Sequence, residues 1–455
     1  MGTTDREAVV WTRCGSSPSR VGRLIVTDTQ CRFTYEEEFL RSGLPGIGIL
    51  YDPRVIASHT IAWDRTEHFN LLPQLQFLIP PRTDSNFQRR LVLSYLEKQE
   101  RAPAPGFDSD WSLLMVAGHG GVGHLDVFGD DEKAVAWYDD QATPALFTIA
   151  DKFGFSLKEF LTWLDDDAEA LLEALGPTPS VGGAIPKLLL SIPAAGWDGR
   201  IALPTRGYTD SRTNVVLKFE KDSYPGIVEL EALTLDVHRE AGFQVPRYWL
   251  ADIAGVPAIA IERFDRDENG KPRFMETVYS VMATASRRIT DNHSSSYDEI
   301  GLLLDRSPIA VVSDPGQGKQ YLLKRLLMAF VTGNGDLHME NMSLLQRNGK
   351  VEFSPVYDPT PMRAYNRHNM LVPMPFGDYG EYAGSDQPVD FETALLQLTR
   401  SLGVSRPKLR AMIEEVLAVT KDYTQRVAAL VSLPDNNRKL LIGVSEMIRK
   451  KLEKF

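Results

Sequence analysis

Residues 333–345 read GNGDLHMENMSLL and place an acid, an imidazole and an amide between a helix-like run and a strand-like run. Asp336 and Asn341 are five positions apart, which is the spacing of the catalytic loop in phosphotransfer enzymes. There the aspartate accepts the proton of the attacking hydroxyl, and the asparagine side-chain oxygen binds Mg²⁺. The stretch therefore predicts a catalytic loop between a helix and a strand.

A second metal-binding acid is expected soon after this loop. The following residues read SLL, then Asn348-Gly349, then VEFSPVYD, which is typical of a β-hairpin. The hairpin leads to Asp358 at its far end. Asn341 and Asp358 thus predict two oxygen ligands for an octahedral Mg²⁺ that also binds phosphates.

A kinase also needs a lysine on an upstream strand to contact the ATP phosphates. The strand-like run TNVVLKFE at 213–220 offers Lys218, although an ordinary edge lysine explains this residue about equally well. Glu231 begins a helical pattern and is predicted to pair with Lys218, with Glu229 as the alternative.

Phosphates also require a loop of backbone N–H donors. The stretch PSVGGAIPKLLLSI at 179–192 has two glycines ahead of a strand, and glycine lets a backbone approach a ligand closely. The predicted ATP-binding loop consists of Val181, Gly182, Gly183 and Ala184.

Three other motifs are weaker. GHGGVG at 118–123 has the dinucleotide-binding spacing, but the strand-like HLDVF follows it instead of a helix. DRDENGKPRFME at 265–276 has EF-hand spacing, but a strand-like run precedes it, which favours an acidic hairpin turn over a calcium site. GQGK at 316–319 lacks the first glycine of a P-loop, since Ser313 stands there.

Length and composition set wider limits. The 455 residues predict two or three domains, and the net charge of −11 argues against broad nucleic-acid binding by this chain alone. The sequence has no apolar run of about 18 residues, no apolar segment in its first residues, and only two cysteines. We expect a cytoplasmic protein that does not contact the membrane.

Hydropathy patterns predict helices at 85–100 and 155–175, a loop at 102–110, and mainly helices from about residue 285. Strands and turns are expected over 8–40. Apolar residues at helical spacing in the last segment predict a packed helix with a basic face; they are Leu441, Val444, Ile448, Leu452 and Phe455.

With these motifs in order, the chain resembles the HipA family of bacterial serine/threonine kinase toxins over nearly its whole length. The resemblance is carried by SVGGAIPK, VLKFE, IERFDR, GDLHMENMSLL and YDP, and more loosely by the N-terminal part. It implies an α+β, two-lobed protein-kinase-like fold. Its parts would be an N-terminal subdomain (1–135), a β-rich kinase N-lobe (136–264) and a mostly helical C-lobe (265–455).

The resemblance also implies residue roles. Glu262 and Phe264 would meet adenine through the hinge backbone, with Asp265 near the ribose. His338 matches a family histidine of the ATP site and is expected to hold the catalytic loop. Ser180 matches the autophosphorylated serine, with Thr178 as a rival acceptor. Ile185 stands where the family usually has glutamine.

The implied cofactors are ATP and Mg²⁺. The implied partners are a translation-related protein substrate, notably an aminoacyl-tRNA synthetase, and a HipB-like helix-turn-helix antitoxin through which DNA is reached indirectly. Two other functions stay open. One is a small-molecule kinase, and the other is a regulatory binding protein of low activity that acts with an antitoxin on DNA.

Overall fold

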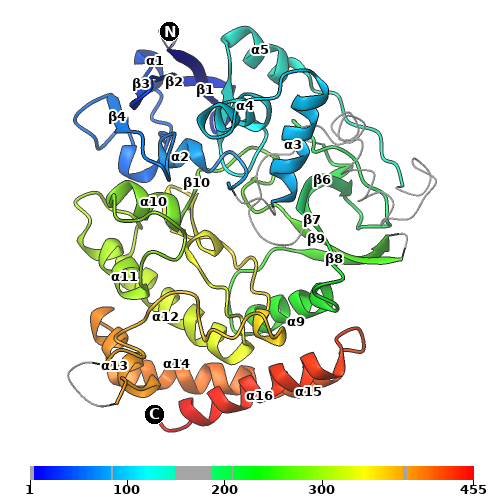
Figure 1. The fold of residues 1–455 in the computed structure, drawn as a ribbon, viewed down its shortest axis with the longest axis vertical. Helices are drawn as coiled ribbons and strands as arrows, with labels where there is room; N and C mark the ends of the chain where they lie inside the picture. The colour runs from blue at the N-terminus through cyan, green and yellow to red at the C-terminus, as the bar shows by residue number, and fades with distance from the viewer. Residues whose placement is uncertain (1–4, 83–85, 149–186, 208, 254, 383–386) are drawn as a thin grey trace. The chain divides into compact units, whose positions relative to one another are not determined.

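The structure is a computed structural model that describes residues 5–82, 86–148, 187–207, 209–253, 255–382 and 387–455. The chain forms two compact units. Unit 1 contains residues 1–220 and 247–276, and unit 2 contains residues 221–246 and 277–455. Figure 1 labels the helices and strands and draws the remaining residues in grey. The predicted division at residues 135 and 264 stays a prediction.

The first sheet of unit 1 has the strand order β4-β3-β2-β1-β5 and is antiparallel throughout. Its strands are β1 (Arg6–Thr12), β2 (Ser19–Val26), β3 (Gln30–Tyr35), β4 (Thr60–Asp64) and β5 (Leu125–Phe128). In β3 every second side chain is buried, namely Cys31, Phe33 and Tyr35. This alternation is what a sheet with one face in the core requires. The strands expected over 8–40 are confirmed, and β5 confirms the strand after GHGGVG.

Short helices accompany this sheet. They are α1 (Glu37–Leu40), η1 (Ile49–Tyr51), α2 (Pro73–Gln76), α3 (Phe87–Lys98), α4 (Phe107–Ala117) and α5 (Asp131–Asp139). Helix α3 confirms the helix predicted at 85–100. The loop predicted at 102–110 is shorter than expected, because α4 begins at Phe107. Asp108 and Asp110 lie in its first turn, where carboxylates favour the positive end of a helix.

The second sheet of unit 1 has the order β6-β7-β9-β8, and all its neighbours are antiparallel. Its strands are β6 (Lys187–Pro193), β7 (Arg212–Phe219), β8 (Tyr248–Ile253) and β9 (Val256–Glu262). One face carries a core of buried aliphatic side chains from β6, β7 and β9 together with Phe219. The strand predicted at 213–220 is therefore confirmed as β7.

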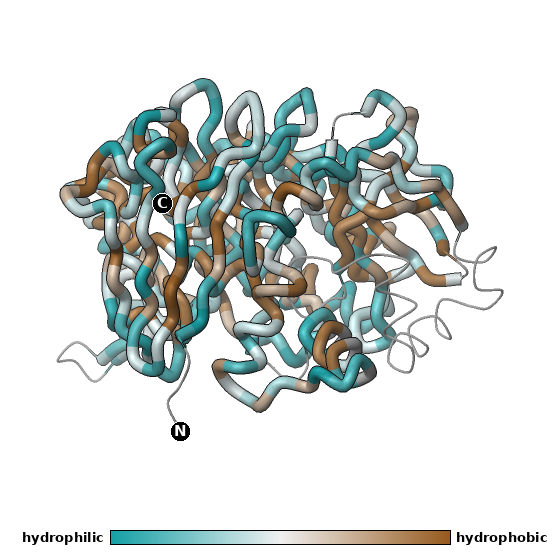
Figure 2. Tube along the Cα trace, turned by 90° about the horizontal axis from the view of Figure 1, so that it is seen from above, coloured by the Kyte–Doolittle hydropathy of each residue, from teal (hydrophilic) through white to brown (hydrophobic). Residues whose placement is uncertain are grey.

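Unit 2 is mostly helical. Its elements are α9 (Ile227–Glu240), α10 (Val278–Ala285), α11 (Tyr297–Arg306), α12 (Pro315–Thr332), η2 (Met339–Asn341), β11 (Ser343–Arg347), β12 (Lys350–Phe353), η3 (Met362–Ala364), α13 (Phe391–Ser401), α14 (Arg406–Val419), α15 (Tyr423–Ala428) and α16 (Asp435–Leu452). Helix α12 is its central helix and contacts α11, α14 and α16. Brown, hydrophobic segments in Figure 2 alternate with teal, hydrophilic ones along many elements, as amphipathic elements require.

Several further predictions can be compared with these elements. Helix α16 confirms the C-terminal helix, and Leu441, Val444, Ile448 and Leu452 are buried on it. The helix predicted at 155–175 lies outside the described residues. The GQGK stretch lies in the first turns of α12, whose N-cap is Asp314. The acidic segment 265–276 follows strand β9 and runs into strand β10 (Met275–Thr277), whereas an EF-hand loop lies between helices.

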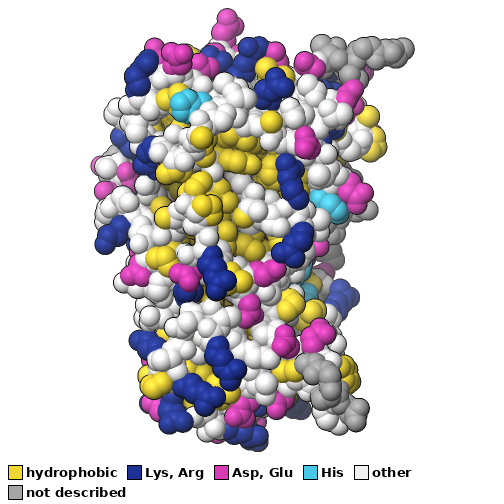
Figure 3. Space-filling model, turned by 90° about the vertical axis from the view of Figure 1, so that its left-hand side faces the viewer, with side chains coloured by type: hydrophobic (Ala, Val, Ile, Leu, Met, Phe, Trp, Pro, Cys, Tyr) yellow, Lys and Arg dark blue, Asp and Glu magenta, His cyan; other side chains and the backbone are white. Residues whose placement is uncertain are grey.

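Among the helices that the structure describes, none has the length and apolarity needed to cross a bilayer. On the face shown in Figure 3, Lys and Arg side chains are interspersed with Asp and Glu side chains.

Candidate active site

The predicted catalytic loop begins where α12 ends. Gly333 caps the helix with φ 73°, a left-handed conformation that glycine adopts without steric cost. A Cβ at this position would lie 2.6 Å from Cδ1 of Leu441 on α16, so any other residue would force that side chain to shift. The chain then passes through η2 into β11. The sequence folds this way locally because a helix-ending glycine and a β-hairpin bracket the polar residues.

Asp336 and Asn341 are brought together by a direct hydrogen bond. The Asn341 Nδ2 donates to the backbone carbonyl of Asp336 at 2.7 Å, across the five-residue loop. Because a carbonyl oxygen only accepts, the amide nitrogen must face it, and Asn341 Oδ1 is the atom left to face a cation. The side chain of Asp336 is 41% exposed, so a substrate hydroxyl can reach its carboxylate.

Two tyrosines, the buried Tyr297 and the half-buried Tyr357, donate hydrogen bonds to the backbone of this loop. The Tyr297 hydroxyl donates to the Leu337 carbonyl at 2.6 Å, and the Tyr357 hydroxyl donates to the Glu340 carbonyl at 2.5 Å. Burial raises the pKa of both phenols well above the ordinary value, so both stay protonated donors. Two rigid donors on neighbouring carbonyls fix the backbone that carries Asp336 and Asn341.

Asp358 lies beyond the hairpin and not at its end, since β12 stops at Phe353. The hairpin itself is confirmed, with Asn348 and Gly349 at φ 50° and 74° in the turn. Asp358 has φ 47°, which is uncommon for a residue other than glycine. Such backbone strain persists where surrounding structure imposes it, often at ligand sites.

A buried cation lies near Asp358. Arg325 of α12 is 1% exposed, burial lowers its pKa, and the negative charge of Asp358 is among those that act against this lowering. Its Nη1 lies 2.7 Å from Nε2 of His238, whose Nδ1 lies 2.7 Å from the Thr234 carbonyl. His238 must therefore be neutral, donating through Nδ1 and accepting at Nε2. Burial and the Arg325 charge lower the His238 pKa, which agrees with this tautomer.

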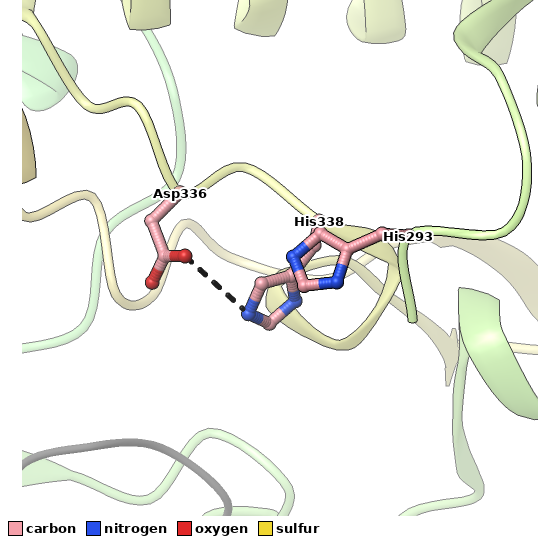
Figure 4. A group of neighbouring side chains, drawn as sticks. All are labelled: His293, Asp336 and His338. Carbon is pink, nitrogen blue, oxygen red and sulfur yellow. Dashed lines mark ion pairs between the residues drawn. The ribbon is translucent and has the colours of Figure 1, made fainter. Parts of the chain in front are cut away.

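Figure 4 shows three side chains that lie close together, Asp336 and His338 of the loop and His293 from another segment. Nε2 of His338 lies 3.8 Å from Oδ1 of Asp336, and the rings of His338 and His293 meet edge to face with centroids 5.2 Å apart. The sequence predicts roles for Asp336 and His338 but gives His293 none. His293 belongs to the segment before α11, so only the fold brings it to the loop.

Lys218 lies on β7 of unit 1 and is 2% exposed. Its register partner on β6 is Lys187, which is 5% exposed. Like charges directly opposite each other in a sheet are unfavourable. Because it lies opposite Lys218, Lys187 is a further candidate phosphate contact that sequence reasoning missed; its only sequence signal is its place just after the glycine-containing loop.

Glu262 is the last residue of β9 in unit 1, and Phe264 lies two residues beyond it. The Glu262 carboxylate binds the Arg247 guanidinium through two contacts of 2.7 and 2.8 Å. The backbone N–H of Glu262 donates to the Arg247 carbonyl at 2.9 Å. Contact of the hinge backbone with adenine stays a prediction.

Asp265 is buried in an ion-paired cluster. Its carboxylate accepts from Arg263 at 2.7 and 3.0 Å, from Arg266 at 3.0 Å and from the Gly123 N–H at 2.9 Å. Burial alone would raise the pKa of this carboxyl, but the two guanidinium charges and these hydrogen bonds lower it below the ordinary value. The cluster ties the end of β9 to the 118–123 turn, a structural role that competes with the ribose contact implied by the resemblance.

The remaining site predictions fall elsewhere. Glu231 is 1% exposed on α9 in unit 2, whereas Lys218 is in unit 1, so their pairing stays a prediction. The loop Val181, Gly182, Gly183 and Ala184 lies outside the described residues, as do Ser180, Thr178 and Ile185.

Comparison with known proteins identifies the family. Residues 179–423 match the family model of the HipA-like C-terminal domain, which is more than half of the chain. The chain therefore belongs to the HipA family.

Relatives and a solved structure agree with this assignment. The chain is 27% identical over 259 residues to a Haemophilus influenzae protein named "Putative kinase", covering 51% of this chain and 69% of that protein. It is 27% identical over 214 residues to the serine/threonine-protein kinase toxin HipA of Shewanella oneidensis, covering 44% of this chain and 47% of that toxin. A Shewanella oneidensis structure of HipA, HipB and operator DNA matches with a TM-score of 0.63 and 17% identity, covering 98% of this chain and 97% of that chain. The fold is thus the predicted α+β, protein-kinase-like fold.

Proposed function

We propose that this chain is an ATP-dependent serine/threonine protein kinase of the HipA type. The observation that carries the proposal is the loop in which Asn341 Nδ2 bonds the Asp336 carbonyl at 2.7 Å. This bond occupies Asn341 Nδ2, so Oδ1 would be the atom that binds Mg²⁺, and the Asp336 side chain is 41% exposed and would be open to a substrate hydroxyl. Membership of the HipA family and the names of its relatives support the same activity.

In the proposed reaction a serine or threonine oxygen attacks the γ-phosphorus of ATP. A new P–O bond forms, the bond to the β-phosphate oxygen breaks, and ADP leaves. The hydroxyl proton passes to the Asp336 carboxylate. Asn341 and Asp358 would hold Mg²⁺, whose positive charge balances the phosphate oxygens.

The other predicted residues would complete the ATP site. Lys218 would contact the phosphates, oriented by Glu231, with Lys187 as a second contact. Val181, Gly182, Gly183 and Ala184 would supply backbone N–H donors, and the backbone of Glu262 and Phe264 would meet adenine. His338 would hold the catalytic loop. Asp265 would lie near the ribose, and this contact requires its ion pairs with Arg263 and Arg266 to open.

Ser180 is the proposed autophosphorylation site. A phosphate there would add about −1.5 to −2 charges beside a loop that binds the γ-phosphate. The resulting repulsion would displace the loop and switch the kinase off.

The first experiment compares wild type with Asp336→Asn after incubation with Mg-ATP, by intact mass and peptide mapping. We expect one added phosphate on Ser180 in wild type and a rate lower by about 10²–10⁴-fold in the variant, since a general base is lost. Glu268→Gln, at an exposed position outside the loop, serves as the control and should behave as wild type. Equal phosphorylation of wild type and Asp336→Asn would refute the proposed base.

The proposed partners follow from the family. A translation-related protein such as an aminoacyl-tRNA synthetase is the proposed substrate, and a HipB-like antitoxin would neutralise the kinase and link it to DNA. A phosphoproteome recorded after induction of wild type and Asp336→Asn tests the substrate class. Phosphorylated metabolites without phosphoproteins would instead favour a small-molecule kinase.

A further inference from the structure

His293, Asp336 and His338 form a compact group of three ligand side chains in unit 2. One ligand atom from each lies within 4.8 Å of the others. His338 Nε2 and Asp336 Oδ1 are 3.8 Å apart. Ligand atoms of a tetrahedral Zn²⁺ site are separated by about 3.4 Å when the bonds are about 2.1 Å long. Only small side-chain rotations would therefore close the group around an ion.

The backbone that carries His293 is tied to the catalytic loop by contacts that involve neither imidazole. Met339 N–H donates to the Asn292 carbonyl at 3.2 Å, and Asn292 Nδ2 donates to Glu340 Oε2 at 2.8 Å. The Asp291 carboxylate accepts from the His293 N–H at 2.8 Å. The two histidine-bearing segments are thus held together before any ligand binds, which lowers the cost of forming a site.

The chemistry of this group differs from that of the proposed Mg²⁺ ligands. Asn341 and Asp358 offer only oxygen atoms, which suit a hard cation such as Mg²⁺. Two imidazoles with one carboxylate instead suit borderline first-row ions such as Zn²⁺. A protein that uses Mg-ATP can therefore bind the two kinds of ion at different positions.

We propose that His293, Asp336 and His338 bind Zn²⁺ or a similar transition-metal ion, and that occupancy of this site inhibits phosphoryl transfer. The inhibition rests on the proposed function, because a carboxylate bound to the ion no longer accepts the proton of the substrate hydroxyl. The side chains of His293 and Asp336 are 47% and 41% exposed, so an ion can enter from solvent.

Metal binding is tested first, without any reference to activity. Untagged full-length wild type, His293→Gln and His59→Gln are titrated with Zn²⁺ by calorimetry and with Co²⁺ by its visible absorption. His59 is an exposed histidine outside the group and serves as the matched control. We expect His293→Gln to bind about tenfold more weakly or worse, because loss of even an outer-shell partner typically costs 10–100-fold. Equal affinity of all three proteins would overturn the site.

Inhibition is then measured as the Zn²⁺ concentration that halves phosphate transfer at saturating Mg-ATP. His293→Gln should match wild type without Zn²⁺ and require about tenfold more Zn²⁺ for half-inhibition. Circular dichroism shows whether the variant is folded. If wild type binds Zn²⁺ through His293 but transfers no phosphate, the proposed function fails and the metal site stands. If Zn²⁺ inhibits both proteins at the same concentration, the regulatory proposal fails.

Discussion

At the residue scale, the acidic and amide side chains of the candidate site and of the Asp265 cluster differ in exposure and in bonding partners. The Asn341 side chain donates to the Asp336 carbonyl, while the Asp336 side chain stays 41% exposed. Asp265, which lies in a motif that the sequence also makes compatible with calcium, is instead neutralised by Arg263 and Arg266. Its two ion-pair partners are neighbours in the sequence, and the fold adds the Gly123 N–H as a further donor to its carboxylate.

The Asp265 cluster gives a prediction about stability. Asp265→Asn would leave Arg263 and Arg266 buried without their counter-charge, and removal of one partner from such a pair typically costs about 3–5 kcal/mol. We expect the free energy of unfolding, measured with urea, to fall by about that amount. Glu268→Gln, an exposed acid of the same segment, is the control and should change it little.

At the scale of elements, helices and turns with strong local signals follow the sequence closely. Helix α3, strand β7, the β11–β12 hairpin and helix α16 all lie where periodicity and turn residues predict them. The start of α4 was missed because its first turn, FDSD, is polar and follows prolines, so local composition resembles a loop. Tertiary packing of the apolar residues that follow, including the buried Trp111 and Leu114, stabilises that helix.

Two glycines on different elements should respond oppositely to alanine. Gly349 has φ 74° in the hairpin turn, and Gly443 lies in the exposed face of α16; a Cβ would meet nothing within 4 Å at either position. The effect of alanine on stability therefore depends only on the backbone conformation at each position. Gly349→Ala should lower the free energy of unfolding by about 1–2 kcal/mol, and Gly443→Ala should raise it by about 0.5–1 kcal/mol. Urea unfolding of both variants tests this; changes of the same sign would contradict it.

At the scale of the whole molecule, both units bury histidines that burial keeps neutral. Burial lowers the pKa of His124 in unit 1 to about 4 and the pKa of His238 in unit 2 well below 6.5. The unfolded chain binds protons at these positions near pH 6.5, whereas the folded chain does not. The stability that these neutral histidines contribute is therefore fully present above about pH 6.5 and is lost as the pH falls toward 4.

His124 allows a direct test of this acid sensitivity. Its Nε2 lies 2.9 Å from the Gly46 carbonyl, a contact that the amide of His124→Gln can also make without titrating. Each such histidine contributes a slope of about 1.4 kcal/mol per pH unit. We expect the variant to lose correspondingly less stability between about pH 6 and about pH 5 in urea unfolding. An unchanged slope would show that His124 does not titrate in this range.

The sequence by itself determined the family, the fold class and the positions of the local elements. It also determined the spacing of Asp336, Asn341 and Asp358 and the glycine-ended helix before them, because these depend on nearby residues and on backbone preferences.

Only the tertiary structure decided which distant residues meet. It placed His293 beside His338, Lys187 opposite Lys218, and Asp265 beside the 118–123 turn. These partners lie far apart along the chain. Hydropathy periodicity reports which face of an element is buried and not what covers that face. Strand pairing and helix packing supply the missing partners, so these contacts follow from the fold.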